Sequence, residues 1–257
     1  MSIFIKNRLL ALLAVLLIVA GLTGCAGDDA AKRKRAQALQ DLGNSLASKG
    51  ELRRGLSKLR EADKLDPGNP DINHEIAVLF RNLGDYQRSL TYFDRALSLK
   101  SPFPEAQNNL GTLYLVQRKW DKAIACFEKA VADYEYRTPQ YAYNNMGIAY
   151  FNKGEYDKAI ESYHRALKSA PRYRLCYINL VRAYTKKREF KKAVDAYRQY
   201  LEYYPKDAGF RLALGRLLLQ MGDTQAAKKE LELTVEYGKK GSEAGEAQVL
   251  LKGLSGK

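Results

Sequence analysis

Histidine is nearly absent from this chain of 257 residues, since it occurs only as His74 and His164. His74 and Glu75 begin like the zinc-binding pattern HExxH, but Val78 stands where the second histidine is needed. The sequence also lacks a phosphate-binding glycine loop and a GxSxG nucleophile turn. These absences argue against catalysis. We therefore expect no catalytic residues, no metal site, no cofactor and no small-molecule substrate, and we predict a binding protein.

An apolar run long enough to cross a bilayer is missing from the N-terminal region. Residues 9–20 are apolar, but a spanning helix needs roughly 20 such residues. The run follows Lys6 and Arg8 and ends in the small residues "GLTG", an arrangement typical of a secretory signal peptide. We predict that residues 1–24 are a signal peptide. The alternative is an uncleaved anchor helix followed by a chance cysteine.

Cysteine is scarce as well, and the first of the three, Cys25, directly follows the small residues. The stretch "LTGC" resembles the bacterial lipoprotein box, which implies cleavage before Cys25 and acylation of its thiol. Two or more acyl chains hold a protein firmly on a membrane. Because Ala26 follows instead of aspartate, the resemblance implies an outer-membrane lipoprotein of a Gram-negative bacterium, facing the periplasm. Residues 25–35 would be the lipidated cysteine and a short tether, and loss of Lys6 and Arg8 would lower the net charge from +14 to +12.

A repeat with a period of 34 residues organises the rest of the chain. Small residues, and valine once, recur at spacings of 34, 34, 36, 34 and 34: Gly43, Ala77, Gly111, Gly147, Val181 and Gly215. A large side chain stands four residues beyond a second small position in each copy: Leu59, Phe93, Phe127, Tyr163, Tyr197 and Leu231. This pattern resembles the tetratricopeptide repeat, a helix-turn-helix unit of 34 residues. The small residues let two helices approach closely, and the large ones fill the gap.

The resemblance predicts an all-α fold, a right-handed α-solenoid of six tetratricopeptide repeats with a C-terminal capping helix. The expected repeats are residues 36–69, 70–103, 104–137, 140–173, 174–207 and 208–241, followed by the capping helix and tail at 242–257. Gly84, Gly154 and Gly222 are expected at turns between helices. Because each repeat contacts mainly its neighbours, Cys126 and Cys176 are too far apart in the repeat order for a disulfide.

Two sets of side chains are candidates for binding a partner in the inner groove, which in this kind of repeat is lined by the first helices. The amide set is Asn108, Asn109, Asn144, Asn145 and Asn179. Amides both donate and accept hydrogen bonds, so they fit the backbone of an extended peptide, or they bridge neighbouring helices. The apolar set is Leu115, Ile148, Phe151 and Ile178. It suits an apolar strand or helix of a protein partner, or it belongs to the core.

Positive charge is concentrated in repeat five, which has nine Lys or Arg against four Asp or Glu. Its turn contains the basic cluster Lys186, Lys187, Arg188, Lys191 and Lys192. Clustered cations attract phosphates, acidic glycans or an acidic protein face, although a merely solvated turn has the same composition. Export to the periplasm argues against nucleic acid as a partner.

The 36-residue step falls in the link "AVADYEYRTPQYAYNNMG", residues 130–147. This link, the lipoprotein box and the six repeats together are similar to those of the type IV pilus biogenesis and stability lipoproteins, the PilW/PilF family. The resemblance implies a pilotin that recognises a secretin subunit through its repeats, while Cys25 anchors it in the membrane. A lipoprotein adaptor that docks periplasmic peptidoglycan hydrolases or other envelope enzymes is the competing prediction, because both functions need only a tethered solenoid.

Overall fold

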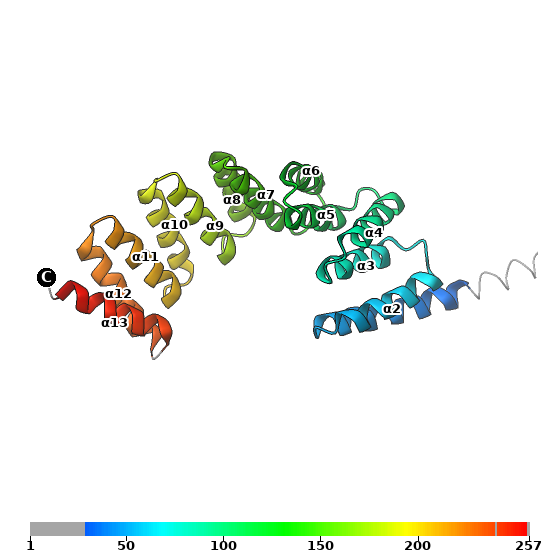
Figure 1. Ribbon diagram of the computed structural model, residues 1–257, viewed down its shortest axis with the longest axis horizontal. Helices are drawn as coiled ribbons and strands as arrows, with labels where there is room; N and C mark the ends of the chain where they lie inside the picture. Colours follow the sequence, from blue (N-terminus) through cyan, green and yellow to red (C-terminus); the bar gives the residue numbers. More distant parts are fainter. Residues whose placement is uncertain (1–28, 240, 256–257) are drawn as a thin grey trace, which may run out of the picture. The chain divides into compact units, whose positions relative to one another are not determined.

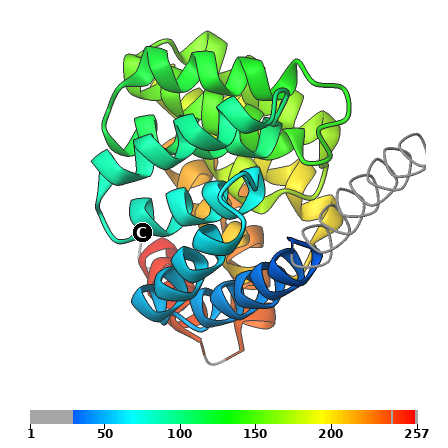
Figure 2. The same ribbon diagram turned by 90° about the vertical axis from the view of Figure 1, so that its right-hand side faces the viewer.

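The computed structural model describes residues 29–239 and 241–255, and every regular element in these ranges is an α-helix (Figures 1 and 2). The predicted all-α fold is thus confirmed. The chain divides into two compact parts, an N-terminal part (1–109) and a C-terminal part (110–257). The predicted signal peptide and the candidate lipidation site Cys25 lie outside the described residues.

The N-terminal part begins with a helix over residues 29–48 and continues with α2 (Leu52–Leu65), α3 (Pro70–Asn82), α4 (Tyr86–Leu99) and the first half of α5 (Pro104–Val116). The C-terminal part holds the rest of α5 and then α6 (Trp120–Val131), α7 (Pro139–Lys153), α8 (Tyr156–Ser169), α9 (Arg174–Lys186), α10 (Phe190–Tyr203), α11 (Ala208–Gln220), α12 (Thr224–Gly238) and α13 (Ser242–Ser255). Residues 29–35, which we expected to belong to the tether, are helical. Their alanines, lysines and arginines are strong helix formers.

Several helices begin at a side chain that satisfies otherwise unpaired backbone amides. The Asn69 side chain accepts hydrogen bonds from the amides of Asp71 (3.0 Å) and Ile72 (3.2 Å), and Pro70 opens α3 with a backbone angle suited to a first helical turn. Asp85, Asp207 and Asp223 cap α4, α11 and α12 in the same way. These caps fix where α3, α4, α11 and α12 begin.

The turns between paired helices need a left-handed backbone, and the predicted glycines occupy it. Gly84, Gly154 and Gly222 have φ of 81–82°, as expected. The equivalent positions in the α5–α6 and α9–α10 turns are held by arginines, with φ of 57° at Arg118 and 60° at Arg188. A non-glycine residue pays a steric cost in this region of about 1–2 kcal/mol.

Close helix contact at the small positions explains the paired pattern of small and large residues. A Cβ atom built on Gly147 would lie 2.7 Å from Cδ1 of Tyr163, and one built on Gly111 would lie 2.5 Å from Cε1 of Phe127. Both distances are far below a normal carbon contact of about 3.5–4.0 Å. Glycine at these two positions therefore lets an aromatic ring of the second helix lie directly against the backbone of the first.

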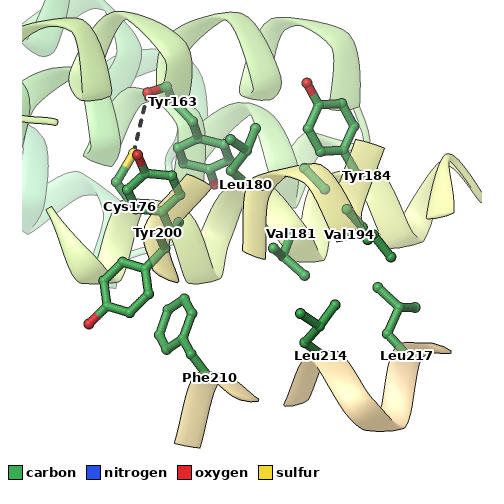
Figure 3. Close-up of a cluster of buried hydrophobic side chains, with 14 of the residues drawn as sticks. Tyr163, Cys176, Leu180, Val181, Tyr184, Val194, Tyr200, Phe210, Leu214 and Leu217 are labelled. Atoms are coloured by element: carbon green, nitrogen blue, oxygen red, sulfur yellow. Dashed lines mark hydrogen bonds between the residues drawn. The ribbon is translucent and has the colours of Figure 1, made fainter. Parts of the chain in front are cut away.

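A core cluster in the C-terminal part joins side chains from α8, α9, α10 and α11 (Figure 3). Tyr163 and Leu180 are 1% exposed, and Leu214 is fully buried. Cys176 is also fully buried, and its thiol donates a hydrogen bond to the Tyr163 carbonyl at 3.3 Å, drawn as the dashed line in Figure 3. Within the C-terminal part, the core therefore continues from α8 through α9 and α10 to α11.

Two further features complete the C-terminal part. Helix α13 covers the end of the last pair, since its Ala247 is fully buried with Leu212 and Leu231, as expected of a capping helix. In the long link between α6 and α7, Tyr136 is 5% exposed and packs with α6 and α7, whereas Tyr134 is 94% exposed. The lengthened link thus places one of its tyrosines in the core.

Candidate partner-binding site

Two of the candidate groove asparagines bind each other across neighbouring repeats. The Asn179 amide on α9 donates to Oδ1 of Asn144 on α7 at 3.0 Å, and Asn144 is only 3% exposed. The two residues are 35 positions apart, one more than the repeat period. This pair ties two first helices together, which is the bridging role that the sequence left open.

Asn109 on α5 bridges to α3 within the N-terminal part. Its Oδ1 and its backbone carbonyl each accept from Nη1 of Arg81 at 3.2 Å, and its Nδ2 lies 2.9 Å from Nε2 of His74. Because Oδ1 faces a guanidinium, Nδ2 is the donor and His74 accepts as a neutral imidazole. Burial lowers the pKa of His74 to about 4, which agrees with that form. Asn108 and Asn145 are half-buried on the same first helices.

The apolar groove candidates are all half-buried and pack against the core clusters of the C-terminal part. Leu115 lies beside the cluster that includes Phe127, and Ile148, Phe151 and Ile178 lie beside the cluster of Figure 3. Phe151, at the end of α7, also meets Tyr156 edge-on with ring centres 5.3 Å apart. Each of these side chains therefore contributes to the core.

The basic turn of repeat five divides into two kinds of cation. Lys187 binds Asp157 of the preceding repeat and also Glu189 at 2.6 Å, and Lys192 binds Glu189 at 2.8 Å. These hydrogen bonds raise the pKa of Lys187. Among the described residues, no carboxylate pairs with Lys186, Arg188 or Lys191. Part of the cluster is therefore neutralised within the protein, and part of it is available to a partner.

A hollow of about 730 Å³ lies where α7, α9, α10 and α11 meet, and it brings the two predicted features together. Its apolar wall is formed by Phe151, Val181, Phe190 and Tyr197, its cations are Arg182, Lys186 and Arg188, and its remaining polar side chains are Thr185 and Gln220. The Arg182 guanidinium lies 5.1 Å from the centre of the Phe151 ring. We call this site the α9–α10 hollow.

The predicted site residues are only partly brought together by the fold. Phe151, Lys186 and Arg188 line the α9–α10 hollow, whereas Asn144 and Asn179 form a bridge elsewhere on α7 and α9. Sequence reasoning missed Arg182, Phe190 and Tyr197. One signal pointed to the place: Val181 is the only large residue among the repeated small positions, and it lines the hollow.

Stacked helix pairs with an open hollow of cations and aromatic rings define a class, the helical-repeat interaction scaffold. Sequence models of the tetratricopeptide repeat match residues 40–105, 74–142, 141–173 and 186–251. The chain belongs to the tetratricopeptide repeat family. Within residues 29–239 and 241–255, no group of three or more metal-ligating side chains is found, and no helix there is long and apolar enough to cross a membrane.

Several solved structures share the fold. PilF of Pseudomonas aeruginosa is similar with a TM-score of 0.68 and 20% identity, over 85% of this chain and 99% of that one. PilW, described as a widely conserved type IV pilus biogenesis factor, gives 0.69 and 23%, over 83% and 98%. YrrB, described as a tetratricopeptide repeat protein with an unusual peptide-binding site, gives 0.55 and 17%, over 74% and 97%. At these identities the likeness establishes the fold.

Proposed function

We propose that this protein is a non-enzymatic lipoprotein scaffold of the bacterial outer membrane, facing the periplasm, and that it acts as a pilotin in type IV pilus biogenesis. In this role it binds a secretin subunit through its repeat surface and assists the assembly or localisation of the secretin. The observation that carries the partner-binding part is the α9–α10 hollow, where three cations stand beside aromatic side chains and, within the part of the chain that the structure describes, have no carboxylate partner.

The pilus part of the proposal is supported by length and by the N-terminal sequence. The fold shared with PilF and PilW extends over 99% and 98% of those chains, so it includes the whole repeat array and not a single generic pair. The stretch ending in Cys25 adds a candidate acylation site directly before the repeats. Acyl chains at this cysteine would hold the scaffold at the membrane, where the secretin ring must assemble.

Deletion of the gene tests the pilotin role. Membranes of the deletion strain, run on a denaturing gel without boiling, are expected to lose the secretin multimers, and the wild-type gene is expected to restore them. A Cys25→Ala variant should be made in normal amounts but fail to label with palmitate, and it should leave the outer-membrane fraction. Unchanged multimers and normal pili in the deletion strain would refute the proposal.

A further inference from the structure

One repeat departs from a packing rule that the other repeats obey. The large residue 16 positions after the small one is at most 1% exposed in five cases: Leu59, Phe93, Phe127, Tyr163 and Leu231. The corresponding side chain of repeat five, Tyr197, is only half-buried and faces the α9–α10 hollow. Repeat five is also the one whose small position holds valine, at Val181.

The geometry of the neighbouring repeat explains the difference. At Gly147 even a single added carbon would lie 2.7 Å from the Tyr163 ring, so an aromatic side chain can settle there only against glycine or a residue almost as small. Val181 is 5% exposed and fills that space with a branched side chain. The Tyr197 ring instead meets Phe210 edge-on, with ring centres 5.7 Å apart. Val181 and Tyr197 then both line the hollow.

We propose that Val181 holds the α9–α10 hollow open, and that the hollow receives a large apolar side chain from an acidic segment of the partner protein. This inference rests on the partner-binding function proposed above. The apolar wall of Phe151, Val181, Phe190 and Tyr197 suits a buried anchor residue.

Charge complementarity identifies the flanking residues. Arg182, Lys186 and Arg188 stand around the hollow, and among the described residues no carboxylate pairs with them. A segment with aspartate or glutamate on both sides of the anchor would supply those partners. The guanidinium group of arginine can also bind a carboxylate through two parallel hydrogen bonds.

Binding of a defined peptide to the full-length protein in detergent tests the assignment. The probe is the fluorescein-labelled peptide Gly-Asp-Glu-Phe-Glu-Asp-Gly, followed by fluorescence anisotropy. Two control peptides carry serine in place of phenylalanine, or asparagine and glutamine in place of the acidic residues. Each control is expected to bind about tenfold more weakly or worse. Equal binding of all three peptides would overturn the proposed ligand chemistry, as would binding to vesicles of phosphatidylglycerol but not to the peptide.

Substitutions at the hollow separate a specific role from general damage. Val181→Ala should weaken binding of the probe peptide about tenfold or more. In repeat two, alanine at this position (Ala77) accompanies a fully buried Phe93. We therefore expect Tyr197 to settle against the introduced alanine in the same way and to close the hollow. Val181→Ile keeps a branched side chain and should bind within about threefold of the unchanged protein. Equal binding by V181A and the unchanged protein, with both folded, would overturn the role of Val181.

The charged side of the site has its own matched pair of variants. The double variant R182Q/R188Q should lose binding and its salt dependence, whereas K228Q/K229Q, which removes two exposed cations of α12 outside the hollow, should bind normally. An equal loss in both would mean that only net charge matters, and it would overturn the site.

The outcomes for the hollow and for the pilus role are distinguishable. Probe binding that V181A abolishes, together with intact secretin multimers in the deletion strain, would leave the hollow standing and refute the pilotin role. Loss of multimers in the deletion strain, with normal multimers in a V181A strain, would support the pilotin role and refute this hollow as the secretin site.

Discussion

Replacing Gly147 by alanine should destabilise the protein, although alanine normally favours a helix. Gly147 lies inside α7, and the added Cβ would be 2.7 Å from Cδ1 and 2.9 Å from Cζ of Tyr163. Tyr163 is 1% exposed and packs in the core cluster of Figure 3, so its ring cannot move without displacing other buried side chains. The strain therefore falls on close-packed neighbours.

The magnitude follows from two opposing effects. Overpacking a well-filled core costs about 1–3 kcal/mol, and a clash with a rigid ring places this site at about 3 kcal/mol. The helix preference of alanine over glycine offsets about 1 kcal/mol of that cost. We expect Gly147→Ala to lower the free energy of unfolding by about 2 kcal/mol, which corresponds to a fall in Tm of about 4–8 °C for a chain of this size.

The assay is thermal and urea unfolding followed by circular dichroism, with hydrogen exchange of the α7 and α8 amides. Gly245→Ala in α13 is the matched control, because no atom outside the adjoining helix backbone lies within 4 Å of the added Cβ there. It should raise stability by up to about 1 kcal/mol. Opposite shifts for the two alanines support the packing argument, whereas a Gly147→Ala protein as stable as the Gly245→Ala protein would refute it.

Two further predictions concern the turns and the buried histidine. Arg118→Gly should raise the free energy of unfolding by about 1 kcal/mol, because glycine removes the cost of the left-handed backbone at φ 57°; an unchanged or lower urea midpoint would contradict this. His74 has a folded-state pKa of about 4, below its value of 6.5 in the unfolded chain, so unfolding takes up a proton as pH falls through this window. Stability should therefore drop by about 2 kcal/mol between pH 7 and pH 5 on this account, and His74→Gln should remove that part of the dependence. Parallel pH profiles for the two proteins would count against it.

The repeat pattern predicts the fold well because the packing is local and periodic. Gly111 with Phe127 and Gly147 with Tyr163 are 16 residues apart, and the structure brings each pair into direct contact. The first helix is the exception, since it begins by residue 29 and not near residue 36. The repeat alignment carries no information about residues that precede the first copy.

The roles of the candidate site residues could be predicted only in part. Asparagines at equivalent positions have different partners, since Asn109 contacts His74 whereas Asn179 donates to Asn144, although each partner stands 35 residues earlier in the chain. In the basic turn, Lys187 is neutralised by Asp157, which belongs to another repeat. A count of charges along one repeat cannot reveal a partner that the neighbouring repeat supplies.

The hollow beside Val181 has a consequence for how such proteins diverge. The hollow depends on the size of one side chain at a repeated position. The helices that surround it still bury their other core residues as the neighbouring repeats do. At another repeat, a larger side chain at this position would create a comparable recess only together with a shift of its partner ring, because that ring packs directly against the small residue. Repeat arrays built in this way can exchange partners in small evolutionary steps, with each step confined to one pair of helices.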